Sequence, residues 1–178
     1  MNLDLEELPR GGEVFDQLRR GIHIDESEPK LHRALAEHFA EFRELFDYLG
    51  FRLEEHERNF FYFRSDSPSS GPGKRARRIS VFFFVFVDAL SSRGEDAVEV
   101  LFRPEGHRVG ELPHLERALH RECLAGVGVD NEADLDDLVR SMARYNFVDR
   151  LGDGHFRVRK PAWRFVELCY EFVDDSEE

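Results

Sequence analysis

The sequence contains only two cysteines, Cys123 and Cys169, which lie far apart and form no CxxC pair. This scarcity excludes a disulfide-stapled secreted domain and is typical of proteins from a reducing cytosol. The first ten residues, MNLDLEELPR, lack the basic and apolar segments of a signal peptide. We therefore expect a soluble cytoplasmic protein.

Catalytic motifs are also missing. The sequence has no Walker A loop, GxGxxG, HExxH or GxSxG motif, and so offers neither a phosphate cradle nor a nucleophile elbow. Its many carboxylates are scattered along predicted helix surfaces, where no acid–base pair stands out. We expect a protein that is not an enzyme and binds no cofactor.

One spacing could serve a metal ion. Glu116, His120 and Cys123 lie at i, i+4 and i+7, which places them on one helix face. A metal site needs a fourth ligand or water and supporting hydrogen bonds, and no further ligand is suggested. An exposed Glu–His pair beside a small buried cysteine is the favoured interpretation, so we expect no metal.

Positive charge and long apolar runs are scarce as well. The net charge of −12 argues against a protein that coats nucleic acid non-specifically, because phosphate binding rests on lysine and arginine. The longest apolar run is bracketed by Arg78 and Asp88, far short of the roughly 20 residues of a membrane span. We expect no membrane contact.

Phenylalanine, by contrast, is abundant, with 17 residues, and it concentrates in the stretch Lys74–Leu90. Both faces of a helix through this stretch would be apolar, although the run VFFFVFV also fits a strand. Length favours the helix, which must then be buried by another domain or another chain. Candidate residues for such a dimer or domain interface are Phe82, Phe83, Phe86 and Leu90.

The rest of the sequence alternates helical patterns with hairpin patterns. Residues 30–49 predict one amphipathic helix ended by Gly50, and residues 51–64 predict a hairpin. The segment 65–73 is rich in Ser, Pro and Gly and predicts a loop. In the second half, helices at 114–124 and 131–145 precede a hairpin around Gly152–Gly154 and a last helix after Pro161.

This order predicts a mostly α fold with small β hairpins (α+β), built as tandem winged helix-turn-helix domains. We expect a flexible acidic arm at 1–12 and an N-terminal winged-helix domain at 13–92 that includes the central helix 74–92. A C-terminal winged-helix domain follows at 93–173, with the boundary within 91–112 and an acidic tail at 174–178.

Two basic clusters stand out against the acidic background. We predict that they contact nucleic-acid phosphates, and they consist of Lys74, Arg75, Arg77 and Arg78 at the start of the central helix and Arg157, Arg159 and Lys160 on the second hairpin. The helix 131–145 instead carries four carboxylates near its N-terminal half, which a DNA major groove would repel. Base-specific reading is therefore disfavoured.

Three features together form one overall pattern over about residues 13–173. They are LFDYLGFRLEEHERNFFYFRSD (Leu45–Asp66), the basic-led helix KRARRISVFFFVFVDAL (Lys74–Leu90) and a C-terminal winged helix. In this pattern the chain resembles the MksE family of bacterial condensin accessory subunits. The resemblance implies a tandem winged-helix homodimer that binds a kleisin (MksF-like) and joins an SMC ATPase (MksB-like). It also implies non-specific DNA contact within the complex, a nucleoid location, and a role in chromosome segregation or plasmid defence.

The main alternative is a dimeric winged-helix transcriptional regulator. The acidic helix 131–145 counts against this alternative, whereas operator-specific binding at physiological salt would favour it.

Overall fold

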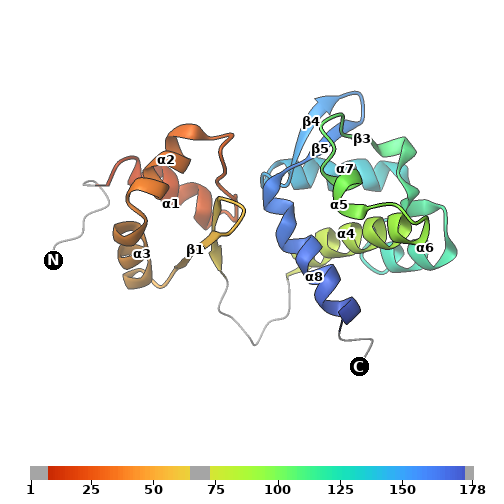
Figure 1. Ribbon diagram of the computed structural model, residues 1–178, viewed down its shortest axis with the longest axis horizontal. Helices are drawn as coiled ribbons and strands as arrows, with labels where there is room; N and C mark the ends of the chain where they lie inside the picture. Colours follow the sequence, from red (N-terminus) through yellow and green to blue (C-terminus); the bar gives the residue numbers. More distant parts are fainter. Residues whose placement is uncertain (1–7, 65–72, 175–178) are drawn as a thin grey trace. The chain divides into compact units, whose positions relative to one another are not determined.

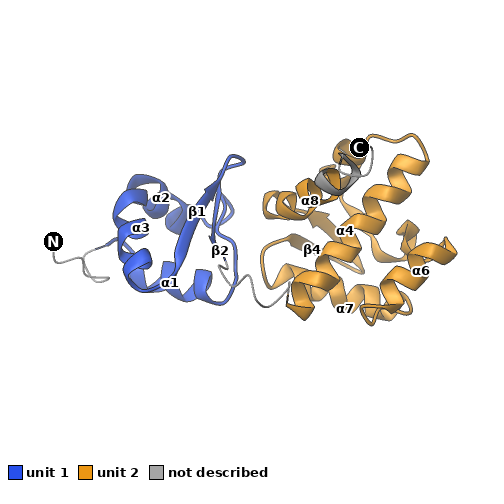
Figure 2. Ribbon diagram, turned by 90° about the horizontal axis from the view of Figure 1, so that it is seen from below, with its two compact units in different colours: residues 1–69 blue, residues 70–178 orange. Residues whose placement is uncertain are grey.

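The computed structural model describes residues 8–64 and 73–174. The chain divides into two compact units, Met1–Ser69 and Ser70–Glu178, each with its own hydrophobic core (Figure 2). The predicted loop at 65–73 and the tail at 174–178 fall almost entirely outside the described residues. Part of the expected N-terminal arm is ordered, because the first helix already begins at Gly11.

Within residues 8–64, unit 1 consists of three helices and a hairpin (Figure 1). Its elements are α1 (Gly11–Arg19), α2 (Pro29–Glu37), α3 (Phe39–Tyr48), β1 (Arg52–His56) and β2 (Phe60–Arg64). The predicted hairpin at 51–64 is confirmed, with Leu53 opposite Phe63 in an antiparallel register. Between α1 and α2, Ile24 forms a single bridge to Phe61 of β2, so the hairpin gains a short third partner.

The predicted helix at 30–49 is interrupted. His38 adopts a non-helical conformation (φ −126°, ψ 32°) and separates α2 from α3. Apolar spacing alone does not detect this break, because the buried side chains Leu35 and Phe42 continue one periodic stripe across it. The predicted end at Gly50 is confirmed, since its φ of +81° is one that glycine adopts readily.

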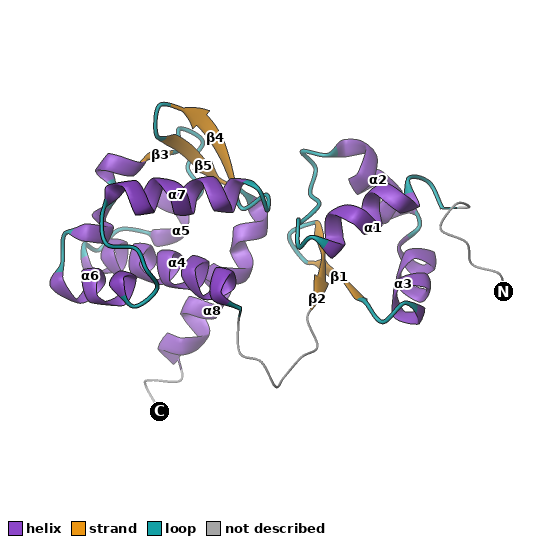
Figure 3. Cartoon of the chain, turned by 180° about the vertical axis from the view of Figure 1, so that it is seen from behind, coloured by secondary structure: helices purple, strands orange, loops and turns teal. Residues whose placement is uncertain are grey.

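Within residues 73–174, unit 2 contains a three-stranded sheet that lies at one edge of its helices (Figure 3). Its first elements are α4 (Lys74–Ser92), α5 (Ala97–Leu101), β3 (His107–Arg108), and the short 3₁₀ helices η1 (Val109–Glu111) and η2 (Pro113–Leu115). They are followed by α6 (Ala118–Ala125), α7 (Glu132–Ala143), β4 (Val148–Gly152), β5 (His155–Val158), η3 (Lys160–Ala162) and α8 (Trp163–Asp174). The strand order is β3–β5–β4, and all pairs are antiparallel.

The two units share one order of elements. Each runs through a helix, a short strand or bridge, two further helices and a hairpin, and in each the early strand pairs with the second strand of the hairpin. Unit 2 adds α5 and α8. The mixture of helices with small antiparallel sheets confirms the predicted α+β class.

The boundary between the units differs from the prediction. We expected the helix 74–92 to complete the N-terminal module and the boundary to fall within 91–112. The structure instead places α4 at the start of unit 2, after a boundary at Ser69. The reason is packing, because α4 lies against α5, α6, α7 and α8, which all follow it in the sequence.

The helical interpretation of Lys74–Leu90 is confirmed, and α4 forms the centre of the unit 2 core. The four residues that we assigned to a dimer or domain interface are at most 3% exposed within the single chain, and they are Phe82, Phe83, Phe86 and Leu90. Phe82 lies 6.4 Å from the Phe156 ring of β5, and Phe83 stacks on Phe165 of α8 at 5.9 Å. The apolar faces of α4 are therefore buried without a second chain.

A buried histidine joins α4 to the segment that follows β3. His114 is fully buried, its Nε2 donates a hydrogen bond to the Phe82 carbonyl at 3.0 Å, and its ring lies 4.3 Å from that of Phe82. Burial lowers the pKa of His114 to about 3, because an imidazolium ion loses hydration in the core. The neutral form of His114 therefore belongs to the folded state.

None of the helices within residues 8–64 and 73–174 has the length and hydropathy of a membrane span.

Truncation of Phe82 tests the central place of α4. Phe82→Ala should lower the free energy of unfolding by about 3–5 kcal/mol, because it removes a fully buried ring and leaves a cavity. Phe84→Ala on the same helix is the matched control, since Phe84 is 40% exposed and its loss should cost less than about 1 kcal/mol. Urea unfolding of both variants measures the two losses of free energy. A loss for Phe82→Ala as small as that expected for Phe84→Ala would show that Phe82 is not a core residue.

The low pKa of His114 predicts acid sensitivity. Protonation favours the unfolded state, so stability present above pH 6.5 is lost as the pH falls towards 3. His107 acts in the same direction, because burial lowers its pKa too. His114→Gln keeps an N–H donor but does not titrate, and should flatten the loss by up to about 1.4 kcal/mol per pH unit. Unfolding curves measured across this range test the prediction, with the half-buried His38→Gln as the control. The prediction is contradicted if both variants keep the wild-type slope.

Candidate nucleic-acid interface

The first basic cluster lies in the first turn of α4. The helix begins after Gly73, which is extended (φ −54°, ψ 155°) and provides no side chain to cap the helix. The first amides of a helix have no intrahelical acceptor, and Arg77 is the first residue whose amide bonds back, to the Gly73 carbonyl at 3.0 Å. This end of α4 therefore carries a partial positive charge in addition to its basic side chains.

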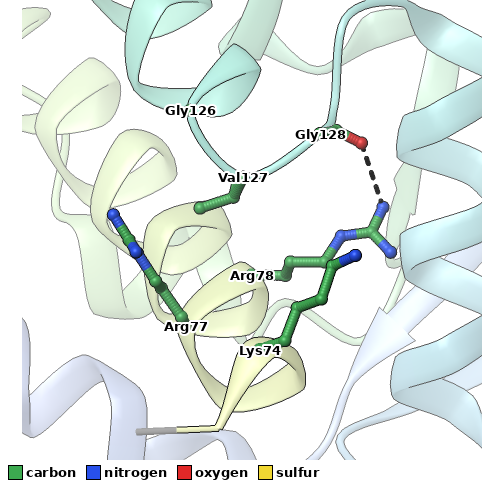
Figure 4. A pocket seen from close by; sticks show the side chains of 6 residues that line it. All are labelled: Lys74, Arg77, Arg78, Gly126, Val127 and Gly128. Carbon is green, nitrogen blue, oxygen red and sulfur yellow. Dashed lines mark hydrogen bonds between the residues drawn. The ribbon is translucent and has the colours of Figure 1, made fainter. Parts of the chain in front are cut away.

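Three of the four predicted residues in this cluster line one pocket. Lys74, Arg77 and Arg78 face the loop 126–128 that follows α6, and together they form an open pocket of about 580 Å³. In Figure 4, Lys74 and Arg78 extend from α4 on the side of Gly128, and Arg77 extends on the other side of Val127. Residues distant in the sequence thus meet at one surface of unit 2.

Arg78 fixes one wall of the pocket. Its Nη2 donates to the Gly128 carbonyl at 3.3 Å (Figure 4). Gly128 has a φ of +72°, in the left-handed region that glycine occupies without strain, and this turn brings its carbonyl to Arg78. The Arg78 Nε is shielded from solvent and has no hydrogen-bond partner among the described residues. Arg78 therefore retains a donor that its own unit does not satisfy.

The pocket has no negative counterpart in the described part of the chain. Elsewhere in unit 2, arginines pair with carboxylates, as Arg117 does with Asp88 at 3.3 Å and Arg93 with Glu116 at 2.5 Å. No described carboxylate forms such a pair with the three basic residues of the pocket. Cations at a helix N-terminus are disfavoured by about 0.3–1 kcal/mol each, a cost that a bound anion would offset.

Arg75, the fourth member of the cluster, has a different neighbour. Its guanidinium carbon lies 3.9 Å from the centre of the Tyr145 ring, just beyond the end of α7. At this distance the guanidinium interacts with the face of the ring. Arg75 therefore connects α4 to α7 and does not belong to the pocket.

The second basic cluster is partly offset by an aspartate that we did not single out. Arg157 of β5 donates to Asp149 of β4 at 2.9 Å, and Arg159 lies 3.4 Å from the same carboxylate with only 11% of its side chain exposed. Phe156 and Val158 of the hairpin are buried. Lys160 lies beyond the hairpin, in η3. The hairpin is thus less positive than its sequence indicates.

The acidic character of the helix 131–145 is retained in the structure. Asn131 caps α7, because its side chain accepts from the Asp134 amide at 3.1 Å. Arg140 of the same helix is held by ion pairs to Asp136 and Asp137. The main cation of α7 is therefore occupied within the helix, and its surface keeps excess negative charge.

The residues with metal-ligand spacing have other partners. His120 is 1% exposed and its Nε2 lies 2.7 Å from the Asp88 carboxylate, while Glu116 binds Arg93. The described residues contain no group of three or more metal-ligating side chains. The position of His120 in the sequence is therefore explained by its contact with Asp88, which joins α6 to α4.

Sequence reasoning missed two parts of this surface. The glycines at 126 and 128 indicate only the end of a helix in the sequence, although their loop forms the far wall of the pocket. Asp149 gave a detectable signal, since cross-strand neighbours in a hairpin such as Asp149 and Arg157 are expected to pair.

Comparison with known families identifies the chain. The family model described as condensin complex protein MksE matches residues 9–170. The chain belongs to the MksE family. The match spans both units, so the two-unit architecture as a whole is part of this assignment. Comparison with curated proteins gives no match.

Membership of the MksE family makes the chain a condensin subunit. It also implies that other condensin subunits are its partners. The basic pocket, the partly offset hairpin and the acidic α7 are therefore features of a condensin subunit.

Proposed function

We propose that the chain is a non-enzymatic accessory subunit of an MksBEF-type condensin that dimerises and binds the kleisin. The match of residues 9–170 to the MksE family is the observation that carries this proposal. Through the kleisin (MksF-like) the subunit joins the SMC ATPase (MksB-like). The absence of a P-loop from the sequence agrees with ATP chemistry in the SMC partner.

Both units are winged helices in this proposal. The repeated order of helix, strand, helix, helix and hairpin supports it, as does the matching position of the early strand beside β2 in unit 1 and β5 in unit 2. An extended kleisin segment can add to the surface of such modules or to the cleft between helices and hairpin. The kleisin is accordingly proposed to bind as an extended chain.

Dimerisation is proposed on the family resemblance and not on α4. The phenylalanines that first suggested a second chain are satisfied inside unit 2. The interface between two copies therefore involves other surfaces, and the folded subunit is expected to be stable before it dimerises.

The biological role proposed is chromosome organisation and segregation, or defence against plasmids, in the cytoplasm at the nucleoid. DNA contact is proposed to be non-specific and to occur within the complex. A transcriptional regulator is less well supported, because α7 occupies the position of a recognition helix yet presents carboxylates, and a major groove flanked by phosphates would repel them.

Light scattering after size exclusion tests the proposed function. The full chain should run as a dimer and should form a stoichiometric complex with the kleisin-like protein encoded in the same genome. Asp137→Arg, an exposed change on α7, should leave the free dimer intact and so serves as a check on sample quality.

A chain that ignores the kleisin and instead binds one short duplex in preference to another of equal length would contradict the proposal and identify a regulator. A kleisin complex that contains only one copy of the chain would contradict dimerisation alone.

A further inference from the structure

We propose that the pocket between the first turn of α4 and the loop 126–128 is the site on this subunit that binds the phosphate backbone of duplex DNA. The second basic cluster, on the β4–β5 hairpin, does not share this role. The proposal rests on the proposed function only in taking DNA as the partner.

Charge is the first argument for a phosphate ligand. The chain carries a net charge of −12, yet Lys74, Arg77 and Arg78 meet at one concave surface without a described carboxylate among the lining residues. Uncompensated cations held together repel one another, and a phosphate is the anion that neutralises them with several hydrogen bonds at once. The pocket is thus complementary in charge to a polyanion, although the net negative charge of the chain repels one.

Geometry is the second argument. Arg78 is anchored by the Gly128 carbonyl, which orients the guanidinium group at the wall of the pocket. Planar guanidinium groups bind phosphate oxygens through paired N–H donors. A positioned arginine flanked by Lys74 and Arg77 supplies such donors from more than one direction.

The pocket lacks the features of base reading. Its wall opposite the basic residues consists of Gly126, Val127 and Gly128, which carry no polar side chain that could reach a base edge. Base-specific contacts use side chains such as Asn, Gln and Arg on an element inserted into a groove. Contacts here position DNA without selecting a sequence.

The β4–β5 hairpin has less of the uncompensated charge that favours phosphate binding at the pocket. Asp149 accepts from Arg157 and lies beside Arg159, so one carboxylate offsets one of the two arginine charges and engages both side chains. A phosphate approaching Arg157 has to displace that ion pair and is repelled by Asp149. The two clusters, equivalent by sequence, are therefore expected to differ in affinity for DNA.

The test is fluorescence anisotropy with the full chain alone and a labelled duplex of about 20 bp, titrated at several salt concentrations. Arg77→Gln is the pocket variant and Arg157→Gln the matched control, since each removes one charge from an exposed arginine. Arg77→Gln should weaken binding about tenfold at low salt and lower the magnitude of the salt slope by about one, as expected for one lost phosphate contact. Arg157→Gln should stay within about twofold of wild type.

Three results would overturn the proposal. They are the absence of duplex binding by the wild-type chain at low salt, equal weakening by both variants, and a preference between two duplexes of unrelated sequence. The thermal unfolding midpoints of both variants should match that of wild type. If Arg77→Gln is destabilised, Lys74→Gln serves as the pocket variant in its place. Because the kleisin is not present, this experiment and the light-scattering test fail or succeed independently.

Discussion

The burial of α4 is the constraint on which unit 2 depends. A helix that is apolar around most of its circumference must be covered on several sides, and α5, α6, α7 and α8 provide that cover. Each fully buried phenylalanine contributes about 1.5–3 kcal/mol to this arrangement. The same burial leaves Phe82, Phe83, Phe86 and Leu90 without exposed surface for a contact between two copies. It also places the boundary between the units on the N-terminal side of the helix.

The basic pocket is a consequence of the same packing. Because the middle of α4 is held against α6 and α7, its first turn lies next to the loop between those helices, where Lys74, Arg77 and Arg78 meet Gly128. The acidic surface of α7 and the partly offset hairpin leave this pocket as the cluster of cations without a paired carboxylate in the described part of unit 2. This contrast is the basis of our proposal that the subunit contacts DNA only at its backbone.

Much of this architecture could be predicted from the sequence because local patterns determine it. The hairpins, the cap at Asn131 and the helix at Lys74–Leu90 follow from alternation, capping chemistry and periodicity. The break at His38 and the placement of α4 in unit 2 could not, because they depend on packing between distant residues. The pocket was half predicted: its cations stand out in the sequence, whereas its opposite wall and the Asp149 pairing need the fold.

Hydrogen exchange along α4, measured in the full chain at high and low protein concentration, tests the central claim most directly. If α4 is the core of its own unit, the amides from Phe82 to Val87 should be among the slowest to exchange, at rates independent of concentration. Protection that falls on dilution would show that α4 owes its burial to a second chain, and would contradict the account.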